Sequence, residues 1–350
     1  MRRALELAVR GARYVSPNPM VGCVILSAKG EFLAEGWHQV YGGPHAEIMA
    51  LRNLPDGADL NEATVYVTLE PCAHYGKTPP CALALSQLPI KRVVVACQDP
   101  NPVVAGQGIK MLEEAGITCE VGLLETEAQQ VNRVFFWRLS HQMPYITLKW
   151  AQTADGFIAR SNYDSKWITG PLSRAWVHKL RSEVDAVAVG GGTSFYDNPE
   201  LNVRSWHGHQ PARLVWASRP DLPQSHNLLS GLQTTYLGWL GQGSAPIWAN
   251  TQTLEVPDGL PMGDRFAFHL KQLASLGIQH VLVEGGSKLL QDLIDHDLWN
   301  EAWVGTNPSM HFQDGIKAPE LKIPPSSQHK LGQDIWSYHA HQLGAGLVSE

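Results

Sequence analysis

Residues 70–81 read EPCAHYGKTPPC, and residues 45–47, upstream of them, read HAE. Together the two segments supply one imidazole and two thiols, which are ligand types that zinc prefers. A catalytic zinc site uses three protein ligands and keeps a fourth position for water. We therefore predict a metal centre held by His45, Cys72 and Cys81.

A carboxylate next to this ligand set gives it a chemical role. Zinc lowers the pKa of a water molecule, and a glutamate that is not a ligand can carry a proton from that water to a leaving amine. We predict that Glu47 is this proton shuttle and that the centre catalyses hydrolytic deamination. The spacing leaves an alternative open, because eight residues separate Cys72 from Cys81, whereas the general deaminase pattern is P-C-x-x-C. In that alternative, His45 is a loop histidine and the cysteines are small buried hydrophobic residues.

The residues around the three ligands favour convergence on one cation. Residues 64–69 (TVYVTL) are β-branched and apolar, which predicts a buried strand that ends just before the first cysteine. Residues 78–80 (TPP) predict a helix start with Cys81 in the first turn, where the helix dipole favours a thiolate. Residues 46–51 predict another helix with His45 at its N-terminus.

Composition restricts the class of protein. The 350 residues are 44% hydrophobic and 17% charged, an ordinary globular balance in a chain long enough for two domains. No apolar run approaches the roughly 18–20 residues of a membrane span, and no segment resembles a signal peptide. Five cysteines without a disulfide-scaffold spacing fit a reducing compartment, so we expect a cytoplasmic location. The net charge of −6 and the absence of a basic run argue against nucleic acid and favour a small-molecule substrate.

The composition changes near residue 143. All five cysteines precede that residue, and ten of the twelve tryptophans follow it. Because proline stops a helix, Met143-Pro144 marks the expected boundary between a domain at residues 1–143 and a domain at residues 144–350. Short apolar strands alternate with helices in both parts, which predicts layered α/β domains.

The helices expected from these patterns include one continuous helix at residues 125–139, and a surface loop is expected at residues 240–263. The second part also has three turns that follow predicted strands: residues 153–156 (TADG), 190–193 (GGGT) and 284–287 (EGGS). Glycines let backbone N–H groups approach a phosphate, and a helix N-terminus adds a favourable dipole. The G-x-G-x-x-G fingerprint is absent, so the alternative is that these glycines only form tight turns.

Longer motifs extend over both parts of the chain. The first part contains residues 17–22 (PNPMVG), 45–47, 70–81 and 98–108 (QDPNPVVAGQG), and the second contains residues 148–156 (LKWAQTADG), 165–169 (SKWIT), 180–181 (LR), 190–193, 197–204 (DNPELNVR) and 283–287 (VEGGS). In this order they resemble the bifunctional deaminase–reductase family of riboflavin biosynthesis. The long interval between the two cysteines is typical of that family.

The resemblance implies a fold and two successive reactions. The fold is a cytidine-deaminase-like, three-layer α/β/α N-terminal domain followed by a dihydrofolate-reductase-like α/β C-terminal domain. The first reaction is zinc-dependent hydrolytic deamination of 2,5-diamino-6-ribosylamino-4(3H)-pyrimidinone 5′-phosphate. The second is NADPH-dependent reduction of the ribosyl side chain, which gives 5-amino-6-ribitylamino-2,4(1H,3H)-pyrimidinedione 5′-phosphate. One zinc ion per deaminase domain, NADPH and a homo-oligomer are also implied.

The resemblance also implies roles for individual residues. Those placed near the substrate of the first reaction are Asn18, His38, His74 and Lys77. Those placed near NADPH are Gln152, Trp167, Thr193, Asp197, Ser218, Gly286 and Ser287. Those placed near the substrate of the second reaction are Ser165, Arg181, Leu201, Arg204 and Glu284. Arg181 and Arg204 could together clamp a phosphate, and Lys149 and Asp155 are candidate proton donors.

The chain departs from the family pattern in residues 305–315 (GTNPSMHFQDG), which lack the usual apolar motif and leave the packing of the last strands open. Two other hypotheses remain at this point. A nucleic-acid base deaminase would share the metal centre but would need a basic face. A protein with one degenerate domain would keep only one of the two activities.

Overall fold

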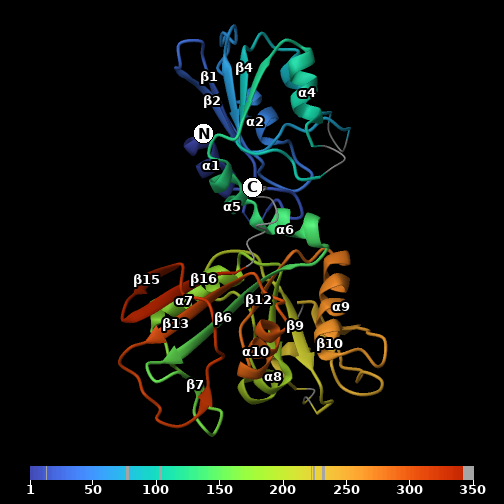
Figure 1. The fold of residues 1–350 in the computed structure, drawn as a ribbon, viewed down its shortest axis with the longest axis vertical. Coiled ribbons are helices and arrows are strands. Elements are labelled where there is room, and N and C mark those ends of the chain that lie inside the picture. The colour runs from blue at the N-terminus through green and yellow to red at the C-terminus, as the bar shows by residue number, and fades with distance from the viewer. Residues whose placement is uncertain are drawn as a thin grey trace. The chain divides into compact units, whose positions relative to one another are not determined.

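The chain folds into two compact units, Met1–His141 and Gln142–Glu350, each described separately below. Figure 1 shows the computed structural model coloured along the chain. The residues that the structure describes are 1–12, 14–75, 79–101, 105–221, 223, 225–230 and 233–341. Among them, no helix is both long and apolar enough to cross a membrane.

The first unit is built on a five-stranded mixed sheet in the order β2-β1-β3-β4-β5. The strands are β1 (Gly22–Leu26), β2 (Phe32–Trp37), β3 (Thr64–Val67), β4 (Arg92–Val95) and β5 (Thr118–Val121). β1 pairs antiparallel with β2 and β3, whereas β3, β4 and β5 run parallel. The carboxyl ends of the parallel strands therefore meet at one edge, where ligands collect in α/β sheets.

Helices cover both faces of this sheet. They are α1 (Arg2–Val9), α2 (Ala46–Arg52), α3 (Cys81–Ser86), α4 (Gln107–Glu114), α5 (Glu125–Val131) and α6 (Arg133–His141). Successive β1 side chains alternate between the faces, because Cys23 and Ile25 pack with α2 and α3 while Val24 packs with α1. The unit is thus a three-layer α/β/α sandwich, as expected.

The prediction of one continuous helix at residues 125–139 was wrong, because the helix is divided at Asn132 into α5 and α6. The Asn132 side chain accepts a hydrogen bond from the backbone N–H of Met20 at 2.8 Å and donates one to its carbonyl, also at 2.8 Å. The amide thus pairs with Met20 as a neighbouring strand would. This pairing fixes the segment before β1, and one continuous helix gives way to two short ones.

The second unit contains a nine-stranded sheet in the order β11-β10-β9-β8-β12-β6-β13-β16-β15. Its strands are β6 (Tyr145–Thr153), β8 (Ala186–Gly190), β9 (Ala212–Ala217), β10 (Thr235–Trp239), β11 (Thr251–Leu254), β12 (His280–Val283), β13 (Glu301–Asn307), β15 (Ser327–Leu331) and β16 (Asp334–Ala340). The seven strands from β11 to β13 run parallel, and β16 and β15 complete the sheet antiparallel. A small separate ribbon pairs β7 (Phe157–Ala159) with β14 (Ile316–Lys317).

Both faces of the large sheet are buried at its central strands, such as β8 and β9. The helical elements are α7 (Pro171–Arg181), α8 (Gly191–Asp197), η1 (Asn227–Leu229), α9 (Met262–Ser275) and α10 (Ser287–Asp295). In β8, Ala186 and Ala188 face the core that contains α9 and α10, whereas Val187 and Val189 face the opposite core. This burial on both sides explains the continuous apolar runs of the strands.

Two expectations for this unit need correction. The surface loop expected at residues 240–263 contains β11, which pairs parallel with β10. Gly191 and Gly192 do not belong to a loop between strand and helix, because they are the first two residues of α8. A Cβ at Gly191 would stand 3.2 Å from the Cβ of Ala217, whereas one at Gly192 would meet no atom within 4 Å. Close packing on β9 therefore accounts for the first glycine but not for the second.

Candidate functional sites: a metal centre and a cavity

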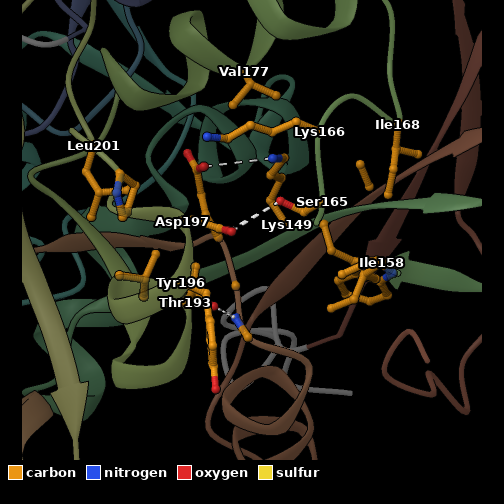
Figure 2. Close-up of a pocket in the computed structure, with 18 of the residues that line it drawn as sticks. Lys149, Ile158, Ser165, Lys166, Ile168, Val177, Thr193, Tyr196, Asp197 and Leu201 are labelled. Carbon is orange, nitrogen blue, oxygen red and sulfur yellow. Dashed lines mark hydrogen bonds and ion pairs between the residues drawn. The ribbon is translucent and has the colours of Figure 1, made fainter. Parts of the chain in front are cut away.

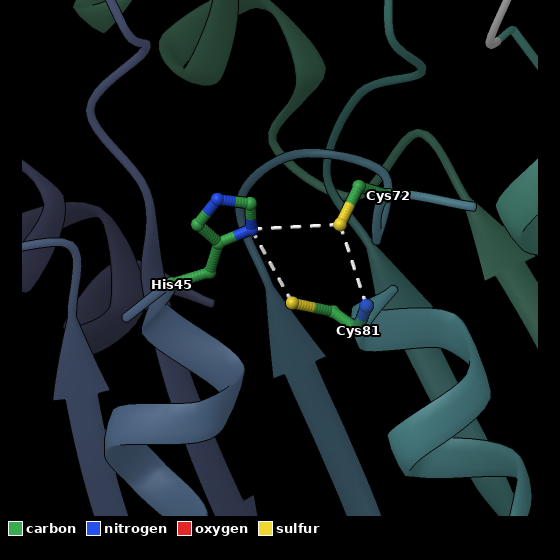
Figure 3. Close-up of side chains that lie close together, drawn as sticks. All are labelled: His45, Cys72 and Cys81. Carbon is green, nitrogen blue, oxygen red and sulfur yellow. Dashed lines mark hydrogen bonds between the residues drawn. The ribbon is translucent and has the colours of Figure 1, made fainter. Parts of the chain in front are cut away.

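His45, Cys72 and Cys81 come together at the carboxyl edge of the first sheet (Figure 3). His45 is the N-cap residue of α2, Cys72 follows β3, and Cys81 is the first residue of α3. His45 Nδ1 lies 3.5 Å from Cys72 Sγ and 3.4 Å from Cys81 Sγ. The three ligand atoms all lie within 4.8 Å of one another, as convergence on one cation requires.

The distances fit zinc. With Zn–S and Zn–N bonds of about 2.3 and 2.0–2.1 Å, a tetrahedral site separates a sulfur ligand from a nitrogen ligand by about 3.6 Å. The two separations from His45 Nδ1 to the sulfurs come close to this value. One imidazole and two thiols also leave one tetrahedral position for water, as a catalytic centre needs.

The electrostatics favour a thiolate in this group. A hydrogen bond from the Cys81 thiol, together with others from His45 and from the Cys81 backbone, outweighs burial and lowers the pKa of Cys72 to about 4. The Cys81 backbone N–H lies 3.3 Å from Cys72 Sγ. In return, the anionic Cys72 raises the pKa of Cys81. The thiolate that binds metal is thus already favoured at Cys72.

Glu47 lies in the first turn of α2, where only 3% of its surface is exposed. Burial is the largest cause that raises the pKa of this carboxyl to about 7, and the nearby Cys72 adds to the effect. A carboxyl group with a pKa near neutrality can both accept and release a proton at physiological pH. The side chain therefore has the chemistry expected of a proton shuttle.

Of the residues expected around the first substrate, Asn18 and His38 are brought together beside the metal ligands. Asn18 Nδ2 donates to His38 Nε2 at 3.2 Å, and His38 Nδ1–H donates to the carbonyl of Pro44 at 2.9 Å. The His38 ring meets that of His45 edge to face, with centroids 5.4 Å apart. His74 is exposed in the segment between the two cysteines, and Lys77 lies outside the described residues.

Glu70 is a residue of this site that sequence reasoning missed. Its carboxylate accepts hydrogen bonds from the backbone N–H groups of Asp99, Gly106, Gly108 and Ile109 at 2.9–3.4 Å. The carboxylate thus caps the N-terminus of α4 and fixes the strand end that leads to Cys72. The signal was present in the sequence, because Glu70 stands directly before Pro71-Cys72 and the glycines recur at 106 and 108.

A cavity of about 600 Å³ lies at the carboxyl ends of the parallel strands of the second unit. Figure 2 shows side chains from β6, β7, α7, α8 and the segment before α7 around it. The expected residues that line this cavity are Ser165, Trp167, Arg181, Thr193, Asp197, Leu201, Arg204, Glu284, Gly286 and Ser287. Ser218 lines a second cavity of about 240 Å³, and Thr193 and Gly286 line both. Gln152 lines neither; its side-chain oxygen accepts from the indole N–H of Trp150 at 2.9 Å.

Two glycine-rich helix starts meet beside the cavity. The backbone N–H of Gly286 donates to Thr193 Oγ1 at 2.7 Å, which links the start of α10 to α8. Gly286 has a φ of +44°, a region that favours glycine. Neither helix has a side-chain hydrogen bond at its N-cap. Both N-cap residues are glycines, which have no side chain to cap the helix, and the N–H groups of a first turn suit an anionic group such as a phosphate.

The phosphate clamp expected from Arg181 and Arg204 is not preformed. Arg181 makes a two-pronged ion pair with Glu284, at 2.6 and 2.7 Å. Arg204 is half exposed and donates to Asn202 Oδ1 at 3.0 Å. Burial on its own would raise the pKa of Glu284, but Arg181 and Lys149 lower it to about 2. The two prongs of Arg181 are therefore occupied by a carboxylate.

The two candidate proton donors behave differently. Lys149 Nζ lies 3.8 Å from Glu284 in the cavity wall, and burial lowers its pKa. Asp155 accepts from Thr153 Oγ1 at 2.5 Å and from the backbone N–H groups of Phe312 and Gln313. These bonds, led by that from Thr153, lower the pKa of Asp155 to about 2. Asp155 is thus ionised and anchors residues 312 and 313 of the unusual 305–315 segment.

His178 is another cavity residue that sequence reasoning missed. Its Nδ1–H donates to the carbonyl of Asn202 at 3.0 Å, and burial lowers its pKa. The signal was its position in α7, three residues before Arg181, because residues three apart share one face of a helix.

Comparison with known proteins agrees with this geometry. A model described as the cytidine and deoxycytidylate deaminase zinc-binding region matches residues 1–97, and one described as the RibD C-terminal domain matches residues 144–310. The riboflavin biosynthesis protein RibD of Actinobacillus pleuropneumoniae is 46% identical, in an alignment that covers 96% of this chain and 93% of that protein. The chain belongs to the RibD family. RibD of Escherichia coli (strain K12) is 37% identical, in an alignment that covers 90% of this chain and 88% of that protein.

Solved RibD structures share the fold. RibD of Acinetobacter baumannii, form 1, is 35% identical, with a TM-score of 0.84 and 96% of both chains covered. A Thermotoga maritima protein is 34% identical, with a TM-score of 0.85, and the match covers 97% of this chain and 96% of that one. That protein is described as a diaminohydroxyphosphoribosylaminopyrimidine deaminase/5-amino-6-(5-phosphoribosylamino)uracil reductase. The predicted fold class is confirmed, as are zinc and NADPH as the cofactors of the RibD deaminase and reductase domains.

Proposed function

We propose that the chain catalyses two consecutive steps of riboflavin biosynthesis. The first is hydrolytic deamination of 2,5-diamino-6-ribosylamino-4(3H)-pyrimidinone 5′-phosphate, and the second is NADPH-dependent reduction of the ribosyl side chain to ribityl. The observation that carries the proposal is the zinc-type ligand set with a buried Glu47 in one unit and a cavity at two uncapped helix starts in the other. The deaminase and reductase activities named for the Thermotoga maritima relative support the same pair of reactions.

In the deaminase half, His45, Cys72 and Cys81 are proposed to hold zinc. Zinc, when bound, lowers the pKa of a water molecule. Glu47 would take a proton at its carboxylate and deliver it to the departing amine, a role that its pKa of about 7 supports. Asn18 and His38, which lie beside the ligands, are proposed to orient the pyrimidine together with His74 and Lys77.

In the reductase half, NADPH supplies the hydride and the protein positions it. Its proposed contacts are Gln152, Trp167, Thr193, Asp197, Ser218, Gly286 and Ser287. The proposed contacts of the ribosyl phosphate are Ser165, Arg181, Leu201, Arg204 and Glu284. Since Arg181 is paired with Glu284, we propose that Arg204, which is half exposed, makes the main contact with the phosphate. Lys149 is the proposed proton donor, because Asp155 is held ionised.

The deaminase domain is proposed to comprise residues 1–143 and the reductase domain residues 144–350. The division of the chain after His141 supports this boundary. We also propose a homo-oligomer in the cytoplasm. Support for the compartment comes from the five cysteines, none of which forms a disulfide bond in the structure.

The test is mass spectrometry of the diaminopyrimidinone ribosyl phosphate incubated with zinc-loaded protein. Without NADPH, an amino group should be replaced by oxygen. With NADPH, the product should then gain two hydrogens. Deamination alone would support the alternative in which the second domain is degenerate. An unchanged substrate would refute the deaminase activity. Salt-sensitive RNA binding would favour the nucleic-acid deaminase instead.

A further inference from the structure

The rings of Tyr163 and Tyr196 stack face to face at the rim of the second unit's large cavity. Their centroids lie 4.1 Å apart, and their planes differ by 1°. Both residues line the cavity, and 46% and 50% of their surfaces are exposed. Tyr163 belongs to the loop between β7 and α7, whereas Tyr196 belongs to α8. The stack therefore joins two separate elements across the edge of the cavity, and Figure 2 shows Tyr196 beside Thr193 and Asp197.

The backbone at Tyr163 is in a conformation that suits glycine. Its φ is +69°, and a bulky residue in this left-handed region is strained. The turn is closed by Tyr163 N–H to the carbonyl of Arg160 at 2.9 Å and by Arg160 N–H to the carbonyl of Asp164 at 3.0 Å. Such strain persists where the surroundings over-determine it, and it clusters at functional sites. Here this conformation presents the Tyr163 ring to Tyr196.

The loop makes a second, weaker contact with the same helix. Ser165 Oγ lies 3.4 Å from both carboxylate oxygens of Asp197, a long separation for a hydrogen bond. Both residues belong to the proposed ligand contacts, so a ligand would compete for this bond. Neither tyrosine of the stack belongs to the proposed ligand contacts.

On its other side the loop is attached to the 305–315 segment. The Arg160 guanidinium lies 4.1 Å from the ring centroid of Phe312, and Ser161 Oγ donates to Asp314 Oδ2 at 2.7 Å. The loop is thus fixed at its start by these contacts. Toward its end, Tyr163 adds a contact in which neither partner belongs to the proposed ligand contacts.

We propose that Tyr163 and Tyr196 are positioning residues of the reductase. Their stack holds the 160–167 loop against α8, so that Ser165 and Trp167 face the cavity before any ligand arrives. The expected effect on reductase kinetics rests on the proposed function. The expected effect on the 160–167 loop concerns the ligand-free protein alone and can be tested separately.

Limited digestion of the full-length, ligand-free protein with trypsin tests the effect on the loop. Arg160 and Lys166 are exposed cleavage sites within the loop. Since an aromatic stack is worth roughly 2- to 13-fold in an equilibrium, cleavage at these two sites should be about fivefold faster in Tyr196→Ala and Tyr163→Ala. Tyr163→Phe, which keeps the ring, should be cleaved at the wild-type rate. Phe268→Ala is the matched control, because it truncates an exposed aromatic residue of the same unit that lines neither cavity.

Kinetics test the consequence for the reaction. In Tyr196→Ala, the KM of the reductase substrate should rise about fivefold while kcat changes less than twofold, because the stack orders the site before binding. The Tyr163→Ala/Tyr196→Ala double variant should show the same change in KM and cleavage rate as either single variant, since the loss of one ring already abolishes the stack. Wild-type cleavage rates in Tyr196→Ala, or additive effects in the double variant, would overturn the proposal. A wild-type protein that reduces nothing would instead refute the proposed function, while the cleavage rates would still decide whether the stack holds the loop.

Discussion

The carbonyl oxygen of Pro71 fills the space that a side chain at Gly108 would need: a Cβ at Gly108 would stand 1.9 Å from that oxygen. The backbone N–H of Gly108 meanwhile donates to Glu70 at 2.9 Å. The N-terminal turn of α4 and the strand end before Cys72 therefore fit together with no room for a methyl group.

We expect Gly108→Ala to displace Pro71 and, with it, Cys72. The free energy of unfolding should fall by about 1–3 kcal/mol, as in other overpacked sites. Bound zinc, measured by metal analysis, should fall below one per chain together with deaminase activity. Lys110→Ala, an exposed change on the same helix, is the control and should keep full zinc. Full zinc occupancy in Gly108→Ala would contradict the predicted displacement.

Glu47→Gln should abolish deamination and leave zinc in place. The amide retains the shape of the side chain but cannot take up or release the proton, so we expect a loss of at least about 10²-fold. Mass spectrometry of the first product measures the loss, and metal analysis of the same sample measures zinc. Retained activity in this variant would rule out Glu47 as the shuttle.

Removal of zinc should separate the two activities. A chelator should suppress deamination, because His45, Cys72 and Cys81 lose the ion that they hold in the proposed function. Reduction of the already deaminated substrate, followed by NADPH absorbance, should persist, because the cavity residues belong to the other unit. Equal loss of both activities would show that the reductase also depends on the metal.

Glu284→Gln should destabilise the second unit. The substitution leaves the charges of Arg181 and Lys149 buried without their carboxylate, a change that costs about 3–5 kcal/mol in buried pairs. Thermal unfolding measures the effect. Glu200→Gln, which breaks an exposed pair with Arg204, should cost at most about 1 kcal/mol. Equal melting temperatures for the two variants would contradict the prediction.

His269 should make the second unit sensitive to acid. Its Nδ1 accepts from the indole of Trp216 at 3.3 Å, so Nε2 carries the proton and donates to the carbonyl of Leu254. Burial lowers the pKa of His269 to about 4, below its unfolded value near 6.5. The unfolded chain therefore binds the proton more tightly, and stability is complete above pH 6.5 and falls as the pH drops toward 4.

The size of this effect is roughly 3 kcal/mol between pH 6.5 and pH 4, at 1.36 kcal/mol for each pKa unit. Chemical denaturation across this range measures the slope. His269→Gln should be less stable at neutral pH but should lose this part of the slope. An unchanged slope in the variant would show that another group is responsible.

The metal centre could be predicted from sequence because each ligand stands at the end of an element with its own local signal. His45 precedes a helix, Cys72 follows an apolar strand, and the Pro-Pro before Cys81 marks a helix start. Local rules of this kind need no knowledge of the rest of the fold. The three-layer arrangement then brings the ends of the elements together.

Features that depend on distant partners could not be predicted in this way. The break at Asn132 follows from its pairing with Met20, which is 112 residues away. Arg181 is unavailable as a free clamp because Glu284, 103 residues later, occupies it. The strand at Thr251–Leu254 has little apolar character of its own and exists because β10 offers it a partner. In each case tertiary context overrides the local pattern.

Every hydrophobic cluster among the described residues is made entirely from one side of the division after His141. A substitution in either set of clusters therefore disturbs the packing of its own unit and leaves the other set intact. Mutations that adapt one chemistry can accumulate without a matching change in the other. Two enzymes can in this way evolve independently while a single gene keeps their amounts equal.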